Sequence, residues 1–187
     1  MNRHGMTLLE IMVATTILTL VLGSLFTVGQ SLSETTKVQN ARITAGDDAR
    51  RGMQFLVKEL RQASRQSIAW GDLPTSTLSY RVPVDADGNG SAVDVNGNVE
   101  FSDPRTIQVD TDDLNGDGMT TTQLILIDGT TVRVLANNLM TASQAASTGG
   151  IVFAQSGSGL EISIATEASA GKRMMPSGFS ETVVPRN

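Results

Sequence analysis

The residues best suited to chemistry lie in loops rich in Asp, Asn and Gly. The run Asp113-Leu-Asn115-Gly-Asp117-Gly118 places oxygen donors at positions 1, 3 and 5 and glycine at position 6, which is the first half of a calcium-binding loop. The twelfth position, where such a loop needs a bidentate carboxylate, is Leu124. Any calcium site here must therefore be completed from elsewhere, by main-chain carbonyls or by nearby acids. The candidate acids are Asp110 and Asp112.

Two further runs repeat this alternation of oxygen donors. They are Asp85-Ala-Asp87-Gly-Asn89-Gly90, with Asn96 at its twelfth position, and Asp94-Val-Asn96-Gly-Asn98-Val-Glu100. Residues 85–118 hold nine acids and one arginine, a charge of −8, whereas the whole chain carries −5, so the remainder carries +3. A hard cation would relieve this local repulsion and order the loops, and we expect calcium as a cofactor. The alternative is a mobile, solvated insertion, because Asp, Asn and Gly also favour turns.

Several other kinds of chemistry are excluded by composition. The 187 residues contain no cysteine and one histidine, His4, which lies in the N-terminal tail. Thiolate nucleophiles, Cys-ligated metals and a histidine general base within the folded domain are therefore absent. The clustered acids lie in turn-forming loops and not in an evident cleft, so we do not expect an enzyme. An acidic chain with dispersed basic residues is also a poor nucleic-acid binder.

The N-terminus contains a segment long and apolar enough to cross a membrane. Residues 6–28 form a stretch of 23 residues whose single ionisable side chain is Glu10, and a helix of this length spans a hydrocarbon layer of about 30 Å. The alternative is a cleaved secretory signal ending near Gly23. Arg3 and His4 precede the segment, which predicts a cytoplasmic tail and a head on the other side of the membrane.

Gly5, Met6 and Glu10, followed by the apolar run, resemble the class III signal of type IV pilins and type II secretion pseudopilins. The resemblance implies that a prepilin peptidase cleaves after Gly5 and that the new amino group of Met6 is methylated. Met6 stands where the family usually has Phe. After such cleavage Glu10 is the fifth residue of the mature chain.

Glu10 is expected to have a partner, because a carboxylate inside a membrane helix costs a few kcal/mol. The freed amine of Met6 on a neighbouring helix could supply the opposite charge, which gives Glu10 a role in assembly. The alternative is that Glu10 reaches the lipid headgroups from within the first helical turn.

A long helix with one apolar stripe is predicted from residue 6 to residue 69, since no proline precedes Pro74. The stripe consists of Val38, Ala41, Ala45, Ala49, Met53, Leu56, Leu60 and Ala63. Beyond Pro74 the periodicity changes to two, which predicts short strands. The expected strands cover residues 78–84, 107–109, 122–128, 130–136, 151–154, 160–165 and 179–184, with a type I′ turn at Asp128-Gly129. We predict exposed loops at residues 141–149 and 166–177.

Together these patterns predict an α+β fold in which the long N-terminal helix packs on a small antiparallel sheet, as in pilins. The expected divisions are a leader at residues 1–5, a membrane half-helix at 6–29, an amphipathic half-helix at 30–69 and a β-rich head at 70–187 with an acidic insertion at 85–118. Three features are similar to W-type minor pilins and J-type minor pseudopilins: the long acidic insertion, the hairpin followed by Asn137-Asn138-Leu139, and the terminal Val-Val-Pro-Arg-Asn.

This resemblance implies a structural subunit that assembles into, or primes, a type IV pilus or a secretion pseudopilus. Its partners would be other pilin or pseudopilin subunits, prepilin peptidase and the inner membrane, with the head in the periplasm and no nucleic acid. The alternative is a membrane-anchored, calcium-dependent adhesin outside the cytoplasm.

Overall fold

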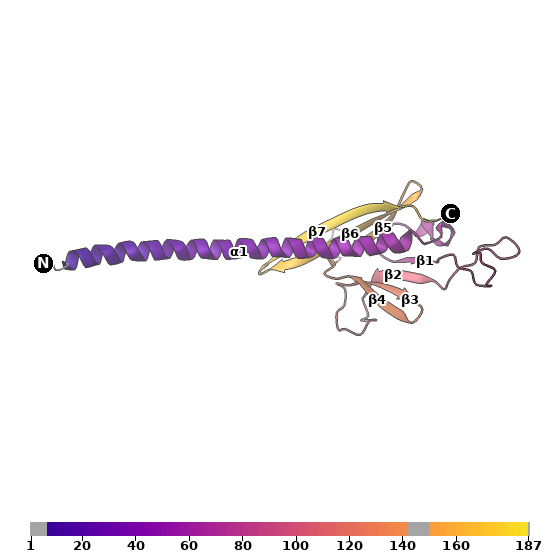
Figure 1. Ribbon diagram of the computed structural model, residues 1–187, viewed down its shortest axis with the longest axis horizontal. Helices are drawn as coiled ribbons and strands as arrows, with labels where there is room; N and C mark the ends of the chain where they lie inside the picture. Colours follow the sequence, from indigo (N-terminus) through magenta and orange to yellow (C-terminus); the bar gives the residue numbers. More distant parts are fainter. Residues whose placement is uncertain (1–6, 142–149, 187) are drawn as a thin grey trace.

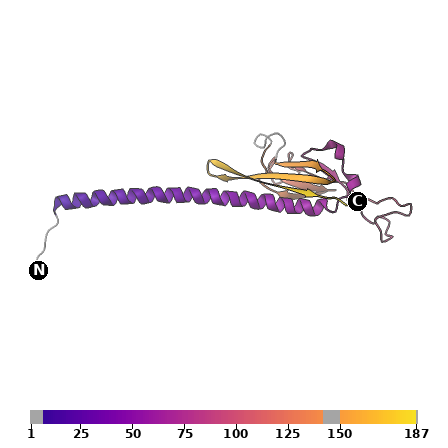
Figure 2. The same ribbon diagram turned by 90° about the horizontal axis from the view of Figure 1, so that it is seen from above.

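A single long helix carries the head of this protein, in a computed structural model that describes residues 7–141 and 150–186. Helix α1 (Leu8–Leu60) begins at the N-cap Thr7. Residues 7–37 are exposed along the whole N-terminal half of α1, which extends away from the head in both views (Figures 1 and 2). The prediction that the N-terminal half of the helix protrudes is therefore confirmed for its described part.

The helix ends earlier than the predicted residue 69. Beyond Leu60, two short 3-10 turns follow at Arg65–Ser67 and Trp70–Asp72. The backbone N–H of Ser64 donates to the carbonyl of Arg81 at 3.0 Å, and that of Arg65 donates to the carbonyl of Arg186 at 2.7 Å. These tertiary hydrogen bonds replace the next helical bonds, so the chain leaves the helix although its sequence contains no helix-breaking residue there.

The predicted apolar stripe is the contact face of α1. Its buried residues recur every three or four positions, and they are Ala41, Ala45, Ala49, Gly52, Met53, Leu56, Val57 and Leu60. Gly52 allows the helix backbone to lie close to the strands, because a Cβ at this position would lie 2.7 Å from Cβ of Ala136 on β4 and 2.9 Å from Cδ1 of Ile164 on β6. The helix therefore packs against two sheets at once, at a point where a larger residue does not fit.

The head contains two antiparallel sheets, whereas one had been predicted. One has the order β5-β6-β7, with β5 at Ile151–Ser156, β6 at Gly159–Ala170 and β7 at Arg173–Val183. The other has the order β1-β2-β3-β4. Its strands are Leu78–Tyr80, Arg105–Val109, Leu124–Asp128 and Thr131–Ala136. The helix contacts β6 and β7 most extensively and also touches β4.

One predicted loop and one predicted turn type differ from the structure. Residues 166–177 are not a loop, because β6 continues to Ala170 and pairs with β7 as far as Arg173. The expected loop at 141–149 lies, except for its first residue, outside the described residues. The β3–β4 hairpin is confirmed, but Asp128 pairs with Thr131, so the two turn residues are Gly129 and Thr130. Positive φ occurs at Gly129, +58°, and not at Thr130, which fits a type II′ turn and not the predicted I′.

Arg105 on β2 connects the four-stranded sheet to α1. Its guanidinium lies 3.2 Å from the carboxylate of Glu59 on the helix and 3.1 Å from that of Asp128 on β3. The hydroxyl of Tyr80 donates to Glu59 at 3.4 Å. Burial, followed by the negative charge of Glu59, raises the pKa of Tyr80 well above its ordinary value. Tyr80 is therefore a neutral hydrogen-bond donor at this junction.

Candidate functional site

The start of α1 holds Thr7 and Glu10 in a reciprocal cap. The backbone N–H of Glu10 donates to the hydroxyl of Thr7 at 3.3 Å, and the backbone N–H of Thr7 donates to the Glu10 carboxylate at 3.4 Å. Such a capping box satisfies two of the N–H groups that a helix start leaves free. Gly5 and Met6, the predicted processing residues, lie outside the described residues. Glu10 is exposed, so its carboxylate is accessible to a second molecule.

The half of α1 that follows Glu10 is suited to an apolar environment. A window of it has a mean hydropathy of 2.2, and it is the one described helix long and apolar enough to span a membrane. Its hydroxyls bond to carbonyls one turn earlier: Thr15 to Ile11, Thr16 to Met12, Thr19 to Thr15 and Thr27 to Gly23. These polar side chains therefore need no water.

The second candidate site lies in the acidic loops, where Asp85 anchors the first half-loop. Its two carboxylate oxygens accept hydrogen bonds from the backbone N–H groups of Gly88, Asn89 and Gly90, at 2.7 to 3.0 Å. These bonds, led by that of Gly90, lower the pKa of Asp85 below its usual value. The carboxylate is therefore ionised at neutral pH and fixed in position by the loop backbone.

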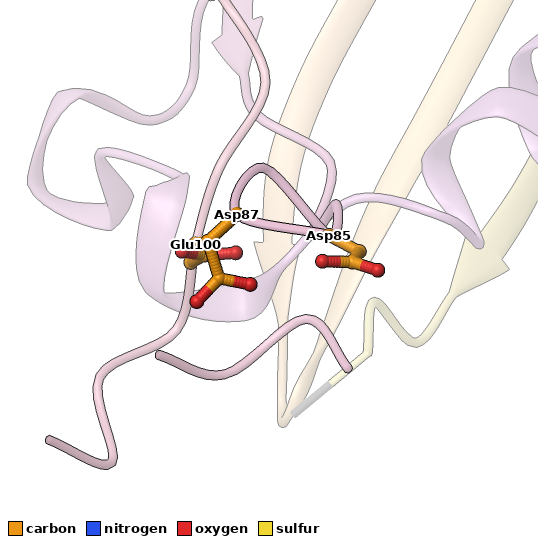
Figure 3. Close-up of side chains that lie close together, drawn as sticks. All are labelled: Asp85, Asp87 and Glu100. Carbon is orange, nitrogen blue, oxygen red and sulfur yellow. The ribbon is translucent and has the colours of Figure 1, made fainter. Parts of the chain in front are cut away.

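Asp85, Asp87 and Glu100 bring their carboxylates together at this loop (Figure 3). One oxygen from each lies within 4.8 Å of the other two, and of the acids in the described part of the chain only these form such a group of three. We refer to these residues as the acidic triad. No Lys or Arg nitrogen in residues 7–141 and 150–186 lies within 4.0 Å of them. Their mutual repulsion is thus not relieved by a described cation.

Glu100 was not among the predicted metal ligands. The backbone N–H of Val84 donates to the carbonyl of Glu100 at 3.0 Å, and Pro83 bridges to Phe101. This pairing folds the chain back so that Glu100 faces Asp85, and its carboxylate accepts from the N–H of Ala86 at 2.8 Å. The alternating run that ends at Glu100 was the available sequence signal, but the pairing partner was not predictable from spacing.

The predicted half-loop at residues 113–118 forms its turn but does not gather three carboxylates. Asp113 has a φ of +53°, and both of its carboxylate oxygens accept from the N–H of Gly118 at 3.0 and 3.1 Å. Asp117 accepts from the side-chain amides of Asn115 at 3.1 Å and Gln123 at 2.8 Å. The bond from Gln123 is the leading cause that lowers the pKa of Asp117.

The two other acids predicted for this loop have different surroundings. Asp110 is fully buried; one of its carboxylate oxygens accepts from the N–H of Leu114 at 3.0 Å, and the other has no hydrogen-bond partner among the described residues. Asp112 is exposed and accepts from the hydroxyl of Thr111 at 3.3 Å. The run at residues 94–100 is a self-capped turn, in which Asp94 accepts from the N–H groups of Asn96 and Asn98, both at 2.8 Å.

The comparisons with known proteins concern the start of the chain. Residues 1–26 match the family described as the Prokaryotic N-terminal methylation motif. No match was found among curated proteins or among solved structures. The matched segment includes Gly5, Met6 and Glu10, and it covers residues 8–26 of the exposed half of α1. This signal and the fold of one long helix packed on antiparallel sheets support assignment of the chain to the type IV pilin and pseudopilin family.

Proposed function

We propose that this protein is a minor pilin or pseudopilin, a non-enzymatic subunit that assembles into, or primes, a type IV pilus or a type II secretion pseudopilus. The observation that carries the proposal is the continuity of the methylation signal with a half-helix whose residues 7–37 are all exposed. Apolar surface on this scale needs lipid or other helices to cover it. The inner membrane before assembly, and related helices after assembly, would supply that cover, with the head in the periplasm.

Glu10 would act in assembly through its charge. Cleavage after Gly5 would leave the amine of Met6 close in sequence to the capping box, so each subunit would present one cation and one carboxylate at its helix start. In a stack of parallel helices the amine of one subunit can then reach Glu10 of the next. Because both charges lie in an apolar surrounding, their attraction is stronger than in water and would fix the register between subunits.

A minor role is supported by the head surface. The acidic loop at residues 85–100 extends from the end of the head opposite the N-terminus in both views (Figures 1 and 2). Identical subunits would bring many such loops near one another, which costs electrostatic energy. We therefore expect few copies of this chain per filament. The ratio of this chain to the most abundant pilin in sheared filaments measures that copy number.

The assembly role is tested by neutralising Glu10. Glu10→Gln keeps the size and the capping hydrogen bond but removes the charge, whereas Glu34→Gln removes an exposed charge further along the same helix. We expect Glu10→Gln to remain in the membrane fraction but to disappear from filaments, and Glu34→Gln to assemble normally. Incorporation of Glu10→Gln at the wild-type level would contradict the proposal and favour the alternative, an anchored calcium-dependent adhesin.

We further propose that calcium binds the acidic loops. The support is the acidic triad, because oxygens that share a calcium ion at about 2.4 Å are at most about 4.8 Å apart, and the three carboxylates meet this limit. Asn89 could add its side-chain oxygen. The predicted set of Asp113, Asn115 and Asp117, with Asp110 and Asp112, is the second candidate location.

Thermal melting of the full chain in detergent tests this proposal and separates the two locations. A ligand at 100 times its Kd stabilises the folded state by about 2.7 kcal/mol, or roughly 5–10 °C for a chain of this size. Asp87→Asn should abolish the calcium-dependent shift if the acidic triad binds, and Asp113→Asn should abolish it if the second loop binds. Identical melting temperatures in millimolar calcium and in chelator would exclude calcium binding at both locations.

A further inference from the structure

A groove between α1 and the tip of the β6–β7 hairpin carries a cluster of basic side chains. Helix residues from Ser31 to Arg42 line one side of the groove, and residues 170–173 line the other. Four exposed cations lie along it, and we call them the basic collar: Lys37, Arg42, Lys172 and Arg173.

The cations of the basic collar form no ion pair with any residue that the structure describes. Among the residues that the structure describes, no carboxylate lies within 4.0 Å of any of its four cations. The acids that line this groove or the adjoining one are Glu34 and Glu167. Four cations against two acids leave a net charge of +2, in a chain whose total charge is −5. The collar is therefore a local site of attraction for anions.

The end of the groove nearest the N-terminus lies at the level where a membrane surface would be. From Leu8 to Val28 the helix is about 31 Å long, which matches a hydrocarbon layer of about 30 Å. Ser31 then lies about 4.5 Å beyond that layer and Lys37 about 13 Å beyond it. The headgroup region adds about 5–8 Å on each side. The groove thus begins within the headgroups, and the remaining distance to Lys37 is within one Debye length, about 8 Å.

The hairpin reinforces this placement. The turn between β6 and β7 points along α1 toward the N-terminus in both views (Figures 1 and 2), and it carries Lys172 and Arg173 next to helix residues 31–42. A strongly acidic loop occupies the opposite end of the head. The charge distribution along the long axis is therefore polarised, with the basic end nearest the membrane.

We propose that the basic collar binds the phosphate groups of anionic phospholipids at the surface of the membrane in which α1 is anchored. The proposal rests on membrane anchoring by α1 but not on filament assembly or on which face of the membrane the head occupies. Lipid contact would hold the head against the membrane and limit the tilt of α1.

The lysines of the chain make a direct test possible, because there are only three of them. Lys37 and Lys172 belong to the collar, whereas Lys58 is an exposed lysine of the same helix, about 32 Å further from the membrane. An anionic surface at about −30 to −50 mV enriches protons about three- to sevenfold and lowers the fraction of reactive, unprotonated amine accordingly. Acetylation with an amine-reactive ester, read by mass spectrometry, reports this change for each lysine.

The experiment uses the full chain reconstituted in vesicles, with insertion verified by flotation. In vesicles containing phosphatidylglycerol we expect Lys37 and Lys172 to react more slowly than in phosphatidylcholine vesicles, by about 1.5-fold for an amine one Debye length from the surface and by up to about sevenfold for an amine at the surface. Lys58 should react equally in both. Salt at 1 M, where the Debye length is about 3 Å, should remove the difference. The double variant Arg42→Glu, Arg173→Glu should lose the protection, whereas the matched double variant Arg51→Glu, Arg61→Glu should keep it.

Other outcomes overturn the proposal in distinguishable ways. Floating protein with equal acetylation in the two lipids would exclude lipid binding by the collar and leave anchoring intact. Protection that depends on protein density and not on lipid charge would show that the collar binds a second copy of the chain instead. Failure to float would refute membrane anchoring itself, and with it both this inference and the inner-membrane part of the proposed function.

Discussion

Thr7 and Glu10 cap each other: the Thr7 hydroxyl accepts from the backbone N–H of Glu10 at 3.3 Å, and the Glu10 carboxylate accepts from the backbone N–H of Thr7 at 3.4 Å. Glu10 thus has a hydrogen-bond partner within its own chain. The cap leaves its negative charge uncompensated, so this arrangement orders the helix start and leaves the charge available for the proposed pairing with the amine of a neighbouring subunit.

Thr7→Ala is expected to loosen the start of α1. Loss of an N-cap hydroxyl costs about 1 kcal/mol, so the backbone amides of Glu10 and Ile11, which bond to Thr7, should exchange with solvent about fivefold faster. Thr19→Ala is the matched control, because the Thr19 hydroxyl bonds to the carbonyl of Thr15 in mid-helix and caps nothing. Equal exchange at Glu10 and Ile11 in both variants would show that the capping box has no energetic role.

Gly52→Ala is expected to destabilise the head although alanine favours helices. Overpacking costs about 1–3 kcal/mol, and the new methyl would meet Ala136 and Ile164 at less than 3 Å. Thermal melting should show a decrease of several degrees. Gly46→Ala, where the nearest atom to a new Cβ is the Ser177 hydroxyl at 3.7 Å, should instead melt at the same or a higher temperature. The reverse order would contradict the packing described for α1.

Arg105→Met is expected to weaken the junction between α1 and the four-stranded sheet. The variant leaves Glu59, whose side chain is 19% exposed, without its ion-pair partner. We expect a loss of about 1–3 kcal/mol, less than for a fully buried pair. A double-mutant cycle with Glu59→Gln should recover part of the loss, since the unpaired carboxylate is then absent. Strictly additive losses would show that the two residues are not coupled.

Stability should fall at acidic pH because hydrogen bonds lower the pKa values of Asp85, Asp94 and Asp117 below 3.8. The folded state then binds fewer protons than the unfolded state, so this contribution is present above pH 3.8 and is lost as the pH falls further. Replacing all three with Asn should lower the melting temperature at pH 6 and flatten its decrease between pH 4 and pH 2.5. If the melting temperatures of the wild type and the variant fell in parallel across this range, these three carboxylates would not be a source of the pH dependence.

The helix and its buried face were predictable from sequence, because spacing of three and four residues from Ala41 to Leu60 directly encodes a contact stripe. The end of the helix was not, because Ser64 and Arg65 bond to Arg81 and Arg186, which lie far along the chain. Strand β6 was recognised only in part: beyond Ala165 its alternation is between small and polar residues, which has the composition of a loop.

The candidate sites were likewise predictable only where their residues lie close together in sequence. The signal at Gly5, Met6 and Glu10 is local in sequence, and residues 1–26 match the methylation motif. The acidic triad combines Asp85 and Asp87, which were predicted as ligands, with Glu100, which reaches them through strand-like pairing of residues 83–84 with 100–101. Sequence spacing identifies donors within one loop but not those that a second segment brings in.

The intact mass of the protein purified from its native membrane tests the central claim most directly. A pilin or pseudopilin subunit should have lost residues 1–5 and gained one methyl group on Met6, with Glu10 retained as the fifth residue. Gly5→Ile, which places a bulky side chain at the proposed cleavage site, should prevent cleavage, so that the measured mass is that of the full chain. A native mass that corresponds to a chain beginning at Met1, or at a residue beyond Gly23, would contradict the assignment.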